Sequence, residues 1–121
     1  MSLDLGIWRT NDPLGNQGAS DVYHRLNEGD ISALQPHPAI DAFYTDLVAR
    51  FPELDDVPDD KIDDSSYCPW SCRIDRSPRH LVLSFVFSSA EMVGDFVGAL
   101  QEKHRVTVYD PQEGKEYFPD E

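Results

Sequence analysis

Leu81-Val-Leu-Ser-Phe-Val-Phe87 is the longest apolar run of the chain, and Ser88-Ser-Ala-Glu91 follows it directly. The run predicts a strand, and because it is apolar on both faces we expect it inside a sheet. The second stretch has the spacing of a capping box, which predicts that a helix begins there. One face of this strand comprises Leu81, Leu83, Phe85 and Phe87, and the buried face of the helix comprises Val93, Phe96, Val97 and Leu100.

Two helices are predicted upstream of this strand. The clearer one has Pro38 in its first turn, where a missing N–H costs nothing, and it ends before Pro52. The other is short, with Ser20 or Asp21 as its cap. The apolar stripe of the clearer helix comprises Ile40, Phe43, Tyr44, Leu47, Val48 and Phe51, and the short helix carries Val22, Tyr23 and Leu26.

Three further strands complete the predicted sheet. Leu3, Leu5 and Ile7 alternate with less apolar residues, and the stretches 70–76 and 106–109 have strand composition. The order is therefore strand, two helices, strand, strand, helix, strand. With the early helices taken as one crossover, it predicts an α+β, ferredoxin-like βα(α)ββαβ fold, in which helices cover one face of a four-stranded antiparallel sheet. The other face is open, or is covered by a partner or a second copy.

The length predicts a single domain over residues 1–121, with an acidic loop at about 53–67 and a short charged tail from about 113. The start of the chain lacks the pattern of a signal peptide, and no apolar stretch approaches membrane-spanning length. We therefore expect a cytoplasmic protein with reduced thiols.

Acidity is concentrated in one segment of the chain. The formal net charge is -13 on 121 residues. Glu53-Leu-Asp-Asp-Val-Pro-Asp-Asp-Lys-Ile-Asp-Asp64 holds seven carboxylates and one lysine. Such a surface repels nucleic acid and anionic membranes and attracts basic partners, although acidity also serves solubility alone. Nucleic-acid and membrane partners are therefore not expected.

The acidic loop and the aromatic residues after it form the candidate partner-binding surface. Its carboxylates would steer a cationic protein and speed association. Tyr67 and Trp70 are residue types that anchor interfaces, but Trp70 is equally consistent with packing in the core. The proposed carboxylates are Asp55, Asp56, Asp59, Asp60, Asp63 and Asp64.

Catalytic, metal and cofactor sites are not predicted. Cys68 and Cys72 have three residues between them, so a metal site would need His80, with or without Asp75, to fold back beside them. The acidic run lacks the spacing of a calcium loop. An enzyme using Asp110, Glu116 or a histidine as general base is the least supported class, because no nucleophile, base and orienting group can be named together.

Several stretches resemble a group of small, acidic, uncharacterised bacterial proteins. The resemblance covers most of the chain, and it rests on Pro38-Ala-Ile-Asp-Ala-Phe-Tyr44, Arg50-Phe-Pro-Glu-Leu-Asp-Asp56, Cys68-Pro-Trp-Ser71, the stretch 83–97 and Val108-Tyr-Asp-Pro-Gln112. That group usually has serine where this chain has Cys68. Some of its members are similar to immunity proteins that pair with secreted toxins, which implies toxin neutralisation here.

Two hypotheses from different classes follow. The first is a non-enzymatic immunity protein whose acidic loop and aromatic residues occlude the basic active site of a cognate toxin. The second is a small-ligand-binding or regulatory module that uses the open sheet face or an oligomer interface, including that of a homodimer. Its lining residues would be Trp70, Tyr109 and Asp110.

Overall fold

The computed structural model describes residues 2–61, 64 and 67–119 and has an α+β fold. Its sheet is antiparallel, with the order β2-β3-β1-β4-β5. The sheet therefore has five strands, and the expected number of four is wrong. The strands are β1 (Ser2–Trp8), β2 (Asp75–Ser77), β3 (His80–Val86), β4 (Thr107–Asp110) and β5 (Lys115–Tyr117).

Three helices and three 3-10 turns join the strands. The helices are α1 (Gly15–Asn27), α2 (Pro38–Arg50) and α3 (Ala90–His104), and the turns are η1 (Leu54–Asp56), η2 (Asp59–Lys61) and η3 (Phe87–Ser89). None of the helices that the structure describes is long and apolar enough to cross a membrane.

β1 is the central strand of the sheet. It pairs with β3 from Ser2↔Val86 to Trp8↔His80, and with β4 from Gly6↔Tyr109 to Trp8↔Thr107. β3 lies between β1 and β2, which confirms the position predicted from its two apolar faces. The prediction that Phe87 belongs to this strand is wrong. It lies in η3, and 61% of its surface is exposed.

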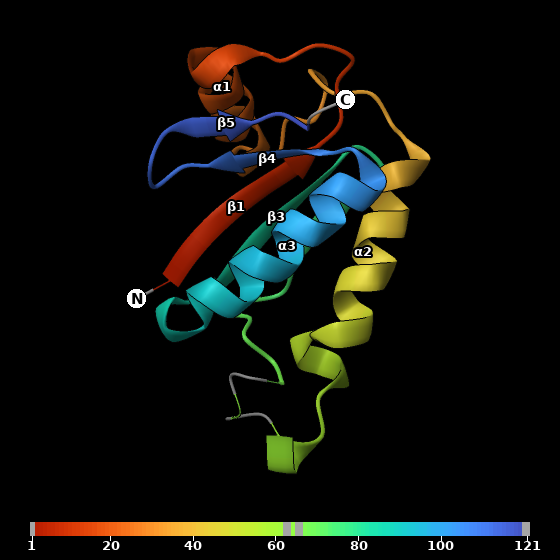
Figure 1. Cartoon of the computed structure of the whole chain (residues 1–121), viewed down its shortest axis with the longest axis vertical. Helices are drawn as coiled ribbons and strands as arrows, with labels where there is room; N and C mark the ends of the chain where they lie inside the picture. The colour runs from red at the N-terminus through yellow and green to blue at the C-terminus, as the bar shows by residue number, and fades with distance from the viewer. Residues whose placement is uncertain (1, 62–63, 65–66, 120–121) are drawn as a thin grey trace.

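The larger core lies between one face of the sheet and the helices α2 and α3, which run side by side across it (Figure 1). The stripe predicted for α2 is confirmed, because Ile40, Phe43, Leu47 and Phe51 are fully buried. Each such side chain contributes roughly 1.5–3 kcal/mol by leaving water. On the sheet side this core contains Ile7, Leu81, Leu83, Phe85 and Val108.

A second core lies on the opposite face of the sheet, beneath α1. Strand alternation sends Gly6 and Trp8 to this face, and the Trp8 ring lies so close to Gly6 that a Cβ there would be 2.9 Å from it. The prediction that helices cover one face only is therefore wrong. This core comprises Trp8, Ala19, Val22, Tyr23, Leu26, Leu34, Val82 and Tyr109.

The stretch that the sequence predicts to be a short charged tail contains strand β5. This strand determines where α1 begins. Gly114 has a φ of 64°, which allows the turn from β4 into β5. The Glu116 carboxylate then accepts the backbone N–H groups of Leu14 and Gly15 at 2.9 and 3.0 Å. Because these donors are satisfied from another element, α1 begins at Gly15 rather than at the predicted cap near Ser20.

Candidate partner-binding surface

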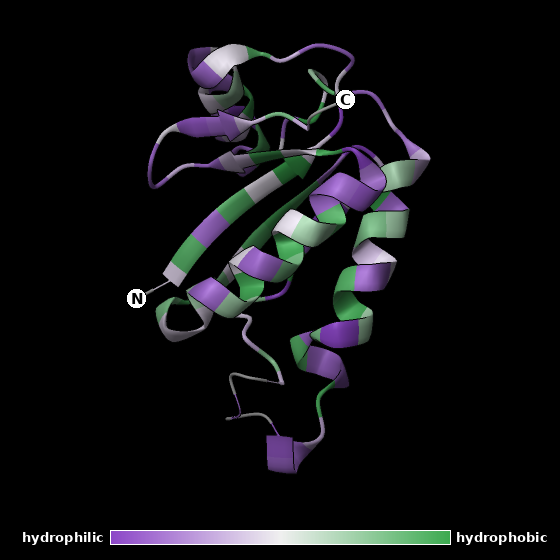
Figure 2. Ribbon diagram, viewed as in Figure 1, coloured by the Kyte–Doolittle hydropathy of each residue, from purple (hydrophilic) through white to green (hydrophobic). Residues whose placement is uncertain are grey.

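The acidic segment leaves the end of α2 and forms a projection at the lower end of the molecule in Figure 1. We define the acidic projection as residues 53–61 together with Asp64. Its outer part, η2, is hydrophilic in Figure 2. The exposed carboxylates are those of Asp55, Asp56, Asp59, Asp60 and Asp64, whereas Asp63 lies outside the described residues.

The base of the projection is built around the buried carboxylate of Glu53, which is 9% exposed. The Tyr44 hydroxyl donates to Glu53 Oε2 at 2.8 Å, and the Ile74 N–H donates to Oε1 at 3.1 Å. Burial and the Glu53 hydrogen bond raise the pKa of Tyr44, so the phenol stays protonated as a donor. Glu53 therefore connects α2 to the chain that returns from the projection.

Trp70 also stabilises the base of the acidic projection, and it does so from within the core. It is 3% exposed, and its Nε1–H donates to the Phe51 carbonyl at 2.9 Å. The rings of Trp70 and Phe51 pack edge to face, with centroids 6.2 Å apart. Trp70 therefore packs in the core, and its ring is not on the surface where a partner would contact it.

The returning chain is attached to the end of β3. The Val86 N–H donates to the Pro69 carbonyl, and the Ser71 N–H donates to the Ser84 carbonyl, both at 2.9 Å. These bonds flank a bridge between Trp70 and Phe85. The chain before the acidic projection is therefore held by the end of α2, and the chain after it is held by the sheet.

Tyr67 and Cys68 lie on this returning chain and are turned toward the interior. Their N–H groups donate to the Asp64 carbonyl at 3.0 and 2.9 Å, and Tyr67 is half-buried against the larger core. The Cys68 thiol donates to the Pro52 carbonyl at 3.4 Å, and burial raises its pKa. Tyr67 thus presents only part of its ring to a partner.

The outer carboxylates differ in their contacts. Asp55 forms an ion pair with Arg73, and both side chains are largely exposed, so the pair contributes little stability. Within the described part of the chain, no ion pair holds Asp56, Asp59 or Asp60. These three carboxylates are available to a cationic partner.

The alternative ligand site proposed from the sequence is not brought together. Trp70 and Tyr109 belong to separate core clusters, and Tyr109 packs against Trp8 and Tyr23. Asp110 Oδ1 accepts the N–H groups of Gln112 and Glu113 in the turn after β4. The three residues therefore line no common cavity.

The groups considered for chemistry have structural contacts. Glu116 caps α1, as described above. His80 Nδ1 lies 2.7 Å from Ser77 Oγ, and its Nε2 lies 3.3 Å from Asp75 Oδ2. Ser77 Oγ also accepts the Arg79 N–H at 3.0 Å, so this network stabilises the hairpin of β2 and β3. Among the described residues, no three His, Cys, Asp or Glu side chains are grouped to hold a metal ion.

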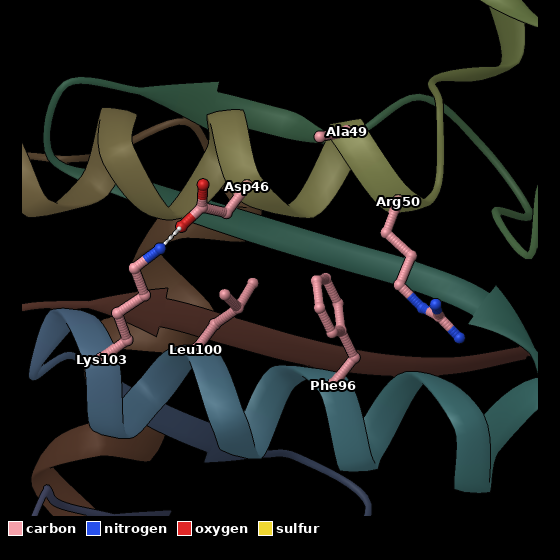
Figure 3. Close-up of a pocket in the computed structure, with 6 residues that line it drawn as sticks. All are labelled: Asp46, Ala49, Arg50, Phe96, Leu100 and Lys103. Carbon is pink, nitrogen blue, oxygen red and sulfur yellow. Dashed lines mark hydrogen bonds and ion pairs between the residues drawn. The ribbon is translucent and has the colours of Figure 1, made fainter.

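A groove between α2 and α3 is a feature that sequence reasoning missed (Figure 3). Asp46 accepts hydrogen bonds from Lys103 Nζ and His104 Nε2, each at 2.8 Å, and these bonds lower its pKa. The i, i+4 spacing of Asp46 and Arg50 was visible in the sequence, but the helix opposite them was not. The groove is lined by Asp46, Ala49, Arg50, Phe96, Leu100 and Lys103.

A scan of the chain against protein-family models finds no match, and no curated protein or solved structure matches it either.

Proposed function

We propose that this chain is a non-enzymatic binding protein that neutralises a basic protein partner, as an immunity protein does for a cognate bacterial toxin. The observation that carries the proposal is the acidic projection, whose exposed carboxylates stand on a base of buried contacts. Neutralisation would occur by occlusion, with Asp56, Asp59 and Asp60 entering the basic active-site cleft of the partner in the cytoplasm.

Two physical consequences of the projection support this function. Clustered carboxylates on a chain of net charge -13 attract a cationic surface and raise the association rate. A projection whose flanking chain is held on both sides loses less conformational freedom on binding than a flexible loop would. The contacts of Glu53 and Trp70 therefore favour binding without touching the partner.

The resemblance to small, acidic bacterial proteins supports the toxin-neutralising form of the proposal. We also propose a ferredoxin-like relationship for the fold, with α1 and α2 as one crossover and β5 as an addition. The neighbouring order of the four strands β2, β3, β1 and β4 supports it.

A pull-down from the source organism, at low and moderate salt, tests the function. We expect one basic protein to be captured stoichiometrically, with less captured as salt rises. The captured protein is then assayed for activity with and without this chain. Loss of its activity on binding supports neutralisation. Capture without inhibition, or no capture of any protein, would contradict the proposal.

A further inference from the structure

The groove between α2 and α3 is a broad depression, open to solvent, that combines apolar side chains with a few charged groups. Its main part has a volume of about 590 Å³, and an adjoining part of about 330 Å³ shares Arg50 and Phe96 with it. Cavities that hold small organic ligands have volumes of roughly 300–1,000 Å³ and combine an apolar surface with a few polar groups. Here Ala49, Phe96 and Leu100 provide the apolar surface (Figure 3).

Arg50 is the cation of this groove that has no polar partner among the described residues. Its guanidinium carbon lies 5.1 Å from the centre of the Phe51 ring and 5.5 Å from that of Phe96. Across the residues that the structure describes, Arg50 makes no hydrogen bond or ion pair through its side chain. Contact with ring faces leaves the N–H donors of a guanidinium group free to bind a ligand.

The other cation of the groove is already satisfied. Lys103 Nζ lies 2.8 Å from Asp46 Oδ2, and this pair lies at the other end of the groove from Arg50 (Figure 3). Asp46 and Asp95, which line the two cavities, disfavour a ligand with two negative charges. One free guanidinium group therefore selects a single negative charge, and its planar fork matches a carboxylate.

We propose that the groove binds a small organic carboxylate with an apolar body. The carboxylate accepts two N–H groups of Arg50, and the apolar body lies on the half-buried ring of Phe96. This site does not include the exposed carboxylates of the acidic projection, so it is independent of the proposed protein-binding function.

Titration of the ¹⁵N-labelled chain with 4-phenylbutyrate, followed by amide chemical shifts, tests the proposal. We expect saturable shifts at the residues lining the groove. Replacing Arg50 with Gln is expected to weaken binding at least about tenfold, because it removes charge-assisted hydrogen bonds. The matched control is Arg25→Gln, which removes an exposed arginine from α1 on the other side of the sheet.

Two further ligands separate the parts of the proposed site. Acetate lacks the apolar body and 4-phenylbutanol lacks the charge, so both are expected to bind more weakly than 4-phenylbutyrate. No saturable shifts with 4-phenylbutyrate, shifts located elsewhere, or equal affinity in the Arg50→Gln variant would overturn the proposal. Replacing Asp56, Asp59 and Asp60 with Asn is expected to leave this binding in place, which distinguishes failure here from failure of the protein-binding function.

Discussion

The base and the tip of the acidic projection carry the same kind of charge but are built differently. At the base, Glu53 is buried and both of its oxygens accept hydrogen bonds from the protein. At the tip, which we define as Asp56, Asp59 and Asp60, the carboxylates are exposed, and no ion pair from the described residues reaches them. One carboxylate therefore holds the structure together, whereas the others are available to a partner.

This difference separates stability from recognition within one short segment. Removing a buried partner leaves a desolvated group unsatisfied, which costs free energy, whereas an exposed carboxylate is solvated whether or not its neighbours remain. Substitutions at the base should therefore lower the free energy of unfolding. Substitutions at the tip should leave it nearly unchanged and should act on partner binding instead.

The largest effect on stability is expected at Trp70. Trp70→Ala removes the ring contact with Phe51 and the hydrogen bond to its carbonyl, and should cost about 3–5 kcal/mol. Trp70→Phe keeps an aromatic ring and should cost clearly less. Denaturant unfolding measures both variants. If Trp70→Ala is as stable as the original chain, Trp70 does not hold the base as described.

A smaller effect is expected at Glu53. Glu53→Gln keeps the size of the side chain but replaces one acceptor oxygen with an NH₂ group, so Tyr44 and Ile74 compete for the remaining oxygen. The expected loss is about 1–3 kcal/mol in the free energy of unfolding. Tyr44→Phe removes one of the two donors, and in the Glu53→Gln background its additional cost should be reduced. Strictly additive costs would contradict a shared network.

The reactivity of the two cysteines tests whether the base of the acidic projection is closed to solvent. Cys72 is exposed, whereas Cys68 is buried at the base and its pKa is raised by burial. Iodoacetamide should therefore modify Cys72 quickly and Cys68 slowly, and the fast phase should disappear in Cys72→Ser. Because the folded chain favours the neutral Cys68 thiol, its contribution to stability is full below the ordinary thiol pKa of 9.0 and is lost as pH rises above it. Equal modification rates would show that the base is open.

The smallest effect on stability is expected at the tip. Replacing Asp56, Asp59 and Asp60 with Asn should change the free energy of unfolding by less than about 0.5 kcal/mol. Any change should be toward higher stability, because self-repulsion in this acidic chain is reduced. Thermal unfolding at low salt measures it. A loss in the free energy of unfolding comparable to that of Glu53→Gln would show that the role of the tip is not separate from that of the base.

Local patterns predicted the elements that local physics determines. The apolar stripe of α2 and the apolar run of β3 were recognisable because their periodicity reports burial directly. The start of α1 was not, because its N–H groups are satisfied by Glu116, which is distant in sequence. β5 was missed because a charged three-residue strand has almost no periodicity of its own.

The candidate sites show the same limit. The exposure of the acidic residues was predictable, since clustered aspartates stay hydrated. The sequence left the burial of Trp70 open as one of two alternatives, because the choice depends on the Phe51 carbonyl and on the end of β3. The groove containing Arg50 required the packing of α2 against α3, which neither helix specifies alone.

The most direct measurement of the central claim compares two triple variants of equal net charge for binding to the captured basic partner. One replaces Asp56, Asp59 and Asp60 at the tip with Asn. The other replaces three exposed carboxylates elsewhere, through Asp12→Asn, Glu28→Gln and Glu102→Gln. Stopped-flow association is measured at several salt concentrations. The account predicts that only the tip variant associates much more slowly and with weaker salt dependence. Equal slowing in both variants would show that net charge, and not the acidic projection, drives binding.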